Sequence, residues 1–297
     1  MTSEDSAFTA DLNRLFTAAL VGIHRTRWIS ISALDGTEQA MRIMEGHRFD
    51  VLPIESGSDV AEYYGTDKWN DYSKVTRKKI EPDEVVRFDT PLLTLLQQFR
   101  AERTHFFLQD GRGKVVGLAS LVNLNCRMAR VCIYDSLCHL ETMLAAFVAE
   151  EVGEEKLFAL TFEGSSGADF ESAKTAFQNH RAEGIEAPLV EYLNLWHFYK
   201  VIMKVKLYPK LDCTRDEMER FRGINELRHR IAHPTRPLIS RPTETETIAA
   251  WVKQLMNLFA KLEQRSVKGA RTVRSSPTRS ETSRPRSSEQ YGDSGSA

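Results

Sequence analysis

The sequence has few cysteines, no long apolar runs and almost no net charge. Its four cysteines are Cys126, Cys132, Cys138 and Cys213. None forms a Cys-x-x-Cys pair, and three lie six residues apart, where a helix would place them on different faces. We therefore expect reduced, packed thiols and no metal site.

Apolar runs such as residues 16–23 and 144–148 fall far short of the roughly 20 residues that cross a bilayer, and no charged-then-apolar leader opens the chain. A cytoplasmic protein with no membrane partner is expected.

The formal net charge of −1 excludes a whole-chain electrostatic attraction to nucleic acid, so any RNA contact must be local. Walker-type glycine loops, His-Glu-x-x-His and Gly-x-Ser-x-Gly are absent, which removes the commonest NTPase, zincin and hydrolase classes.

The chain, at 297 residues, is long enough for two ordinary domains, each with its own core. Apolar spacing predicts one amphipathic helix over residues 8–23. A strand, a helix and a strand follow at residues 28–31, 37–45 and 51–54. The same order returns as a strand over 85–88, a helix over 91–99, a strand over 106–108, a turn at Asp110-Gly111 and a strand over 115–118. This is an internal repeat with a period of about fifty residues, and its two copies are expected to bury each other's faces.

The best-matched segment of the repeat begins at Thr90 and contains Gly117, Ser120 and Asn123. It resembles CBS repeats, which pair into a Bateman module, and the resemblance covers residues 24–127. It implies an α+β CBS-pair domain, preceded by the N-terminal helix, over residues 1–130.

In that family a hydroxyl residue and an acidic residue follow the glycine and contact phosphate and ribose. The resemblance therefore implies a regulatory adenine nucleotide (AMP, ADP or ATP) held by Thr90, Gly117, Ser120 and Asn123. Asparagine in place of the acid weakens a ribose contact, because an amide accepts less strongly than a carboxylate. The first copy, at residues 60–66, lacks the pattern. The alternative is a dimerisation scaffold, in which Ser120 and Asn123 only cap the following helix.

From about Tyr134 onward the apolar spacing is helical. It predicts five helices, with apolar positions within residues 137–148, 170–177, 189–203, 218–231 and 243–264. The fourth opens at a capping box, Thr214 to Glu217. An antiparallel all-α bundle over residues 131–265 follows. Residues 266–297 are rich in Ser, Arg and Pro with almost no apolar residue, so a disordered tail is expected, either solvated or in weak contact with nucleic acid.

The fourth helix carries residues 225–234, Asn-Glu-Leu-Arg-His-Arg-Ile-Ala-His-Pro. This segment resembles the HEPN signature. In that signature a polar residue directly follows an Arg, and a His at the end of the helix is separated from the Arg by four positions. Arg228, His229 and His233 fill these places. The resemblance implies an all-α HEPN helical bundle that forms a homodimer, with two copies of the motif meeting across the interface.

These residue types suit RNA cleavage by the RNA's own 2′-hydroxyl. Histidine, with an unperturbed pKa of about 6.5, suits a proton shuttle at His233. The guanidinium of Arg228 stabilises charge on the phosphate oxygens, and His229 orients the phosphate or donates to the leaving oxygen. The five-residue spacing separates Arg228 and His233 by about 140° on an ideal helix. Pro234 disfavours the α conformation at His233, which lets that residue leave the helix.

The predicted function is a ligand-regulated, metal-independent endoribonuclease of a defence or stress system. The alternative is a non-catalytic CBS/HEPN sensor that dimerises and binds a protein or RNA partner. In that case Arg228 pairs with Glu226 or another acidic neighbour, and His233 caps a helix end, where the helix dipole favours cations.

Overall fold

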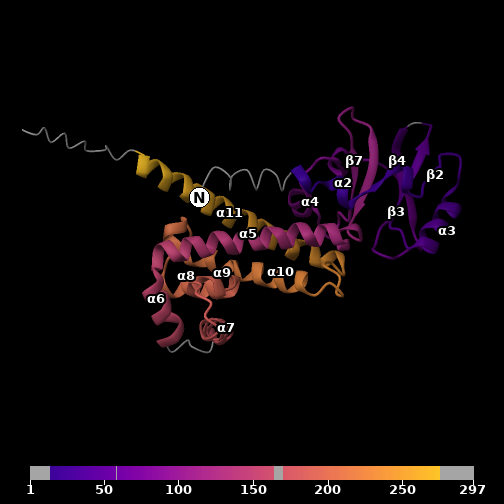
Figure 1. Ribbon diagram of the computed structural model, residues 1–297. Coiled ribbons are helices and arrows are strands. Elements are labelled where there is room, and N and C mark those ends of the chain that lie inside the picture. The colour runs from indigo at the N-terminus through magenta and orange to yellow at the C-terminus, as the bar shows by residue number, and fades with distance from the viewer. Residues whose placement is uncertain (1–13, 58, 164–169, 275–297) are drawn as a thin grey trace, which may run out of the picture.

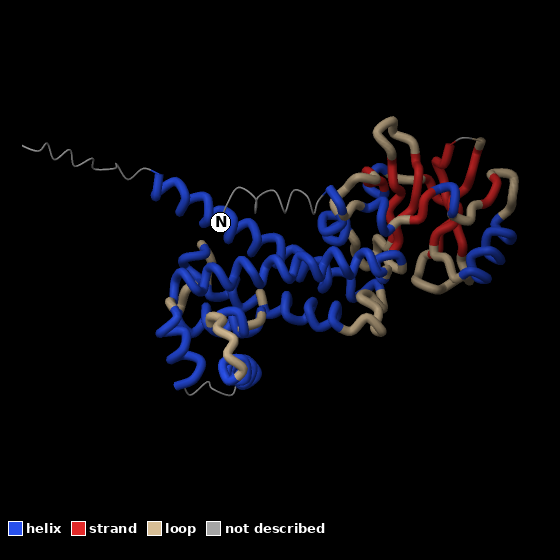
Figure 2. Tube along the Cα trace, viewed as in Figure 1, coloured by secondary structure: helices blue, strands red, loops and turns tan. Residues whose placement is uncertain are grey.

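Strands gather at one end of the molecule and helices at the other (Figure 1, Figure 2). The computed structural model describes residues 14–57, 59–163 and 170–274. Mixed α+β structure extends to Ser120, and the region that follows is helical. The predicted order of a mixed region followed by a helical region is confirmed.

The strand-rich end contains two sheets of four strands each. The first has the order β2-β3-β4-β5, from β2 (Ile31–Ser32), β3 (Val51–Ser56), β4 (Asp59–Thr66) and β5 (Val75–Lys79). The second has the order β1-β8-β7-β6, from β1 (Ile23–His24), β6 (Val85–Arg87), β7 (His105–Gln109) and β8 (Val115–Ser120). The connecting helices are α3 (Thr37–His47), between β2 and β3, and α4 (Leu92–Gln98), between β6 and β7.

The two copies share one pairing pattern, which confirms the internal repeat. In each, the first strand runs parallel to the second across a helix, and the second forms an antiparallel hairpin with the third. Each sheet gains a fourth strand from outside the repeat, β5 beside β4 and β1 beside β8. Neither edge strand is among the predicted elements, and β2 begins at Ile31 rather than at residue 28.

The predicted single helix over residues 8–23 is wrong where the structure describes it, and residues 1–13 lie outside the described part. Residues 14 and 15 are helical, but the helix is interrupted at Phe16 and Thr17, and a short helix, α2 (Ala18–Val21), follows before the chain enters β1. Ala18 N–H donates to the Thr90 carbonyl at 2.8 Å, and Leu92 N–H donates to the Phe16 carbonyl at 2.9 Å. The segment therefore uses its backbone groups to pair with the second copy of the repeat instead of extending a helix.

Side chains alternate between the two faces of each sheet, and this alternation stacks the strand-rich end in layers. In β4, Tyr64 packs on the α3 side and Tyr63 on the side of the second sheet. In β7, Phe107 meets Tyr63 between the sheets, with ring centroids 5.4 Å apart, whereas Phe106 packs on the α4 side. The layers therefore follow the order α3, first sheet, second sheet, α4 (Figure 1).

The described residues of the helical end form seven α-helices: α5 (Arg127–Val152), α6 (Glu154–Phe158), α7 (Glu171–Ala182), α8 (Leu195–Val205), α9 (Arg215–Arg220), α10 (Arg222–Ala232) and α11 (Thr245–Arg274). The predicted capping box is present, because Thr214 Oγ1 accepts from Glu217 N–H at 3.1 Å and the Glu217 carboxylate accepts from Thr214 N–H at 2.8 Å. The predicted fourth helix is divided into α9 and α10 at Phe221, and the third begins only after Asn194, which caps α8.

The disordered tail expected from residue 266 stays a prediction. α11 continues to Arg274, past the expected start of the tail, and a helix that already exists gains one hydrogen bond for each residue added. Residues 275–297 lie outside the described part. The predicted boundary between residues 130 and 131 falls within the beginning of α5, so that one helix spans it.

The two ends share one hydrophobic core, contrary to the expectation of a separate core for each domain. Phe106 and Leu95 of the second copy belong to the same buried cluster as Leu140 of α5 and Leu255 of α11. The first copy keeps a smaller core of its own around Met44. By length and composition α5 is long and apolar enough to cross a membrane, and half of its apolar window is buried inside the protein.

Candidate functional site

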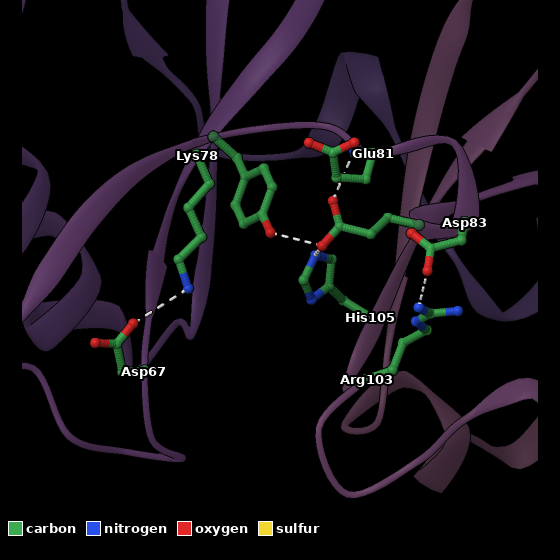
Figure 3. A network of polar contacts seen from close by, with 8 residues as sticks. Asp67, Lys78, Glu81, Asp83, Arg103 and His105 are labelled. Carbon is green, nitrogen blue, oxygen red and sulfur yellow. Dashed lines mark hydrogen bonds and ion pairs between the residues drawn. The ribbon is translucent and has the colours of Figure 1, made fainter.

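A hollow of about 170 Å³ lies between the two copies of the repeat. The first sheet contributes residues of β3, β4 and β5, and the other side is formed by Glu84 and the loop that leads from α4 into β7. The polar lining of this inter-repeat cleft includes two ammonium groups, four carboxylates and several neutral groups: Lys68, Lys78, Asp50, Asp67, Glu84, Glu102, Thr66, Thr104 and His105. Figure 3 shows part of it.

His105 is buried in the wall of the inter-repeat cleft, with 9% of the residue exposed. Its ring makes edge contacts with Tyr63 and Phe107, at centroid distances of 5.1 and 5.6 Å. Its Nε2 lies 3.7 Å from Glu84 Oε1 and has no hydrogen-bond partner among the described residues. Burial lowers the pKa of His105 to about 4, although the Glu84 carboxylate opposes the shift. The ring is therefore neutral at pH 7.

Charged and hydroxyl groups surround this imidazole. Tyr63 Oη donates to Glu84 Oε1 at 2.7 Å, and burial together with this carboxylate raises the pKa of Tyr63. Two ion pairs lie at the edges of the cleft (Figure 3): Lys78 with Asp67, and Arg103 with Asp83. Carboxylates, ammonium groups, hydroxyl groups and a neutral imidazole together suit a polar small molecule.

Acidification should destabilise the folded protein through His105. An unfolded histidine has a pKa of about 6.5, whereas His105 in the folded protein stays neutral to about pH 4. Between these values the unfolded chain binds a proton that the folded protein does not bind, so the free energy of unfolding falls as the pH falls, by on the order of 3 kcal/mol in total. In urea unfolding at pH 7 and pH 4.5, wild type should lose about 2–3 kcal/mol more than His105→Gln. Equal losses for the two proteins would show that this histidine is not the cause.

Of the predicted nucleotide-binding residues, Thr90 and Gly117 lie against the N-terminal segment. The Thr90 carbonyl accepts from Ala18 N–H at 2.8 Å. Gly117 pairs with His24 of β1, and a Cβ at this glycine would lie 2.9 Å from the Ile23 carbonyl oxygen. The close approach of β1 therefore explains the glycine, which also lines a hollow of about 280 Å³ together with His24.

The other two predicted residues, Ser120 and Asn123, bond to each other. Asn123 Oδ1 accepts from Ser120 N–H at 2.8 Å and from Ser120 Oγ at 2.9 Å. The pair closes the turn between β8 and the 3-10 turn Asn123–Asn125. This local bonding resembles the alternative in which Ser120 and Asn123 only cap the following helical turn. None of the four predicted nucleotide-binding residues is among the described residues that line the inter-repeat cleft.

His233 lies just beyond the end of α10 and is exposed. Its backbone torsion angles, φ −108° and ψ 80°, are not helical. His233 is thus outside the α region, which a following proline disfavours, and the predicted departure of His233 from the helix is confirmed. The imidazole is therefore attached to a loop, whereas the rest of the motif lies on the helix.

Arg228 and His229 both have partners within the helical end. Arg228 Nε lies 3.7 Å from Glu141 Oε1 of α5, and the same oxygen accepts from Leu195 N–H at 2.7 Å. The arginine thus pairs with a carboxylate of another helix rather than of its own. His229 Nε2 lies 3.1 Å from Asn225 Nδ2, one turn earlier on α10.

Residues at the junction of the two ends hold the loop that follows α10. Asn125 Nδ2 donates to the Ile239 carbonyl, and Asn125 Oδ1 accepts from Ile239 N–H, both at 3.0 Å. Arg130 donates to the carbonyl of Arg230, at 3.2 Å, and to that of Arg236. Sequence reasoning misses both Asn125 and Arg130, because nothing local indicates partners more than a hundred residues away.

In the part of the chain that the structure describes, no group of three or more His, Cys, Asp or Glu side chains is placed to hold a metal ion. All four cysteines are free thiols. Burial raises the pKa of Cys132, to about 12, and also that of Cys213, so neither is a thiolate at neutral pH.

Comparison with known proteins gives limited information. No protein-family model matches the chain, and no curated protein matches it. Among solved structures, the chain is similar to the CBS domain of a bacterial CNNM/CorC family Mg²⁺ transporter, solved in complex with an inhibitor. The similarity covers 41% of this chain and 80% of the other, with 14% sequence identity and a TM-score of 0.30. A similarity this low assigns no function to the chain.

Proposed function

We propose that this chain is a cytoplasmic regulatory protein, whose strand-rich end senses a small ligand and whose helical end gives the response. One observation carries the proposal. The inter-repeat cleft has a buried His105 nitrogen with no hydrogen-bond partner among the described residues, next to hydroxyl and ammonium groups. Buried polar atoms without partners are rare in folded proteins, and a bound ligand would supply the missing partner.

The proposed ligand is an adenine nucleotide. Lys68 and Lys78 supply ammonium groups for phosphate, and for Lys78 the phosphate would share or replace the ion pair with Asp67. Thr66 and Thr104 supply hydroxyl groups for ribose, and Trp69 supplies an aromatic surface for the base. The site proposed in this way lies between the two copies, rather than at the predicted glycine of β8.

A direct packing route joins the inter-repeat cleft to the helical end. His105 is followed in β7 by Phe106, whose ring meets that of Phe99 edge to face at 5.0 Å. Phe99 terminates α4, and α4 packs against α5 and α11. A ligand that shifts the wall of the cleft at His105 therefore acts on the helical end through packed side chains.

Ligand binding should appear as a stabilisation of the fold. At about 100 times its dissociation constant, a bound nucleotide should raise the free energy of unfolding by roughly 2.7 kcal/mol, measured as a shift in melting temperature. Lys78→Gln should weaken this effect, because it removes an ammonium group from the cleft. The matched control is Lys79→Gln, an exposed neighbour on β5 outside the cleft. No shift with AMP, ADP, ATP or adenosylmethionine would refute the nucleotide assignment.

The response that we propose for the helical end is metal-independent RNA cleavage of the HEPN type, in a homodimer that serves defence or stress control. The conformation of His233 favours it. The imidazole is exposed and free of the helix, while Arg228 stays on α10 with its guanidinium directed by Glu141. A second chain would bring a second copy of the motif to complete the site.

The test is incubation of the purified protein with mixed RNA in EDTA, with and without nucleotide. Attack by the RNA's own 2′-hydroxyl should leave cyclic phosphate ends and should spare DNA, which lacks that group. If intact RNA is recovered under every condition, the remaining function is the alternative one, a non-catalytic sensor that binds a partner.

A further inference from the structure

A second hollow, of about 470 Å³, lies on the helical end. Four cationic side chains line it: Lys200, Lys204, Lys206 and Arg215. Lys200 and Lys204 each make a further interaction, so their charges are not without partners. The hollow nevertheless gathers four cationic side chains on a protein whose formal net charge is −1.

The sequence of α8 explains how the lysines gather. Leu195, Phe198 and Ile202 are buried against the core. Lys200 and Lys204 are four residues apart and therefore share another face of the helix. Lys206, with a left-handed backbone (φ 59°), ends α8 and turns the chain so that its own side chain also reaches the hollow.

The positive charge continues from the hollow to α10 across a pair of stacked aromatic rings. The rings of Trp196 and Tyr199 lie 5.1 Å apart at an interplanar angle of 18°. Lys200 Nζ lies 4.8 Å from the centre of the Trp196 ring, and Arg222 Cζ of α10 lies 5.8 Å from it. α8 contacts both α9 and α10, and the three helices lie along the same side of α5 (Figure 1).

This surface leads to the motif of α10. Arg222 and Asn225 are three residues apart and therefore neighbours on α10. Asn225 Nδ2 in turn lies 3.1 Å from His229 Nε2. A chain of contacts thus runs from the hollow, past Trp196, to the histidine that follows Arg228.

We infer that this α8–α10 basic surface binds single-stranded nucleic acid, specifically RNA when the helical end acts as proposed. The cations of the hollow take successive phosphates, and the Trp196–Tyr199 pair meets the bases. A single strand fits better than a duplex, because only unpaired bases can reach an aromatic ring. Cleavage of the bound strand rests on the proposed function. Binding of the strand does not depend on it.

Two carboxylates limit the strength of the interaction. Glu219 pairs with Arg215 at 3.0 Å, and Glu226 is exposed on α10, one turn after Arg222. Binding is therefore expected to depend strongly on salt rather than to be tight.

The experiment is fluorescence anisotropy of a short, fluorescein-labelled 2′-O-methyl oligouridylate in EDTA. This probe has no free 2′-hydroxyl, so internal attack cannot cleave it and binding is measured alone. For a single strand, each lost phosphate contact lowers by about 0.7 the steepness with which the logarithm of the association constant falls with the logarithm of the salt concentration. Lys204→Gln/Lys206→Gln should therefore lower the slope by about 1.4 and weaken binding roughly tenfold at ~0.1 M salt. Arg222→Gln should lower the slope by about 0.7.

The matched control is Lys79→Gln/Lys253→Gln, which removes two exposed lysines from β5 and α11 and should bind like wild type. Equal binding of wild type and Lys204→Gln/Lys206→Gln would overturn the inference. So would equal affinity for a duplex, or binding of inorganic tripolyphosphate without binding of the oligonucleotide. Binding of the probe by a protein that leaves ordinary RNA intact would support the surface while refuting the cleavage, so the two failures are distinguishable.

Discussion

Phe106→Ala should lower the free energy of unfolding by about 3–5 kcal/mol, and it should destabilise strands and helices together. Phe106 is 1% exposed and packs edge to face on Phe99. The cavity left by the ring would lie in the buried cluster that joins the second copy of the repeat to α5 and α11. A defect in a shared core reaches both ends of the molecule.

Urea unfolding followed by two signals checks this expectation. Helical circular dichroism reports mainly on the helical end. Fluorescence of Trp28 and Trp69 reports on the strand-rich end once Trp196 of α8 and Trp251 of α11 are replaced by Phe in both proteins. Both signals should move to lower urea by the same amount. Phe88→Ala, at a ring that is 39% exposed, is the control and should change the free energy of unfolding by less than about 1 kcal/mol. Two separated transitions, of which only one responds to Phe106→Ala, would contradict a shared core.

The elements that the sequence predicts well are those with a local cause. The capping box at Thr214 and the helix exit at His233 depend on neighbours within three residues, and both are present. The repeat is also visible, because short apolar runs follow a helix in both copies, as β3 in the first and as β7 and β8 in the second, with a turn between β7 and β8. Local rules decide these features, so a single sequence is sufficient to find them.

The elements that the sequence misses have partners far along the chain. β5, with the sequence Val-Thr-Arg-Lys-Lys, has too little apolar alternation to be recognised and is held by pairing with β4, including an ion pair between Arg77 and Glu62. Charged edge strands of this kind discourage pairing with other molecules. The N-terminal segment follows helical spacing, but its hydrogen bonds to Phe88 and Thr90 override that preference.

The same distinction applies to the candidate sites. The motif of α10 is contiguous, so its three residues are found from the sequence, whereas the Glu141 partner of Arg228 is not. The inter-repeat cleft is assembled from segments that lie far apart, and His105 within its strand gives no sign that its ring nitrogen faces a hollow. Ser120 and Asn123 match a family pattern in sequence, but they bond to each other.

The junction between the two ends suggests how a ligand signal would reach His233. The turn that Ser120 and Asn123 close is followed by Asn125, which holds the loop after α10 through Ile239. Arg130, at the start of α5, donates to the Arg236 carbonyl of the same loop and also to the Arg230 carbonyl of α10. A displacement of the second sheet that moves Asn125 would therefore shift the loop that begins at His233.

If His233 transfers the proton and Arg228 stabilises charge on the phosphate, His233→Ala and Arg228→Ala should each lower RNA cleavage by ~100-fold or more. Both proteins should remain folded, because His233 is exposed and Arg228 is only half-buried. Leu227→Ala is the contrasting change. Leu227 is 0% exposed, so its truncation should cost about 2–5 kcal/mol of stability and lower activity by unfolding instead.

Rates are measured in EDTA on the same labelled RNA, with melting curves for every variant, and His47→Ala on α3 serves as a histidine control far from the motif (Figure 1). Loss of cleavage without loss of melting temperature in His233→Ala and Arg228→Ala separates chemistry from folding.

A mixture of the two inactive variants tests the dimer further. If each active site takes its arginine from one chain and its histidine from the other, the mixed dimer contains one site with both residues intact and should recover part of the wild-type rate. If both single variants cleave RNA at the wild-type rate, Arg228 and His233 are not catalytic. Arg228 then has only a structural role in pairing with Glu141, and the helical end only binds a partner.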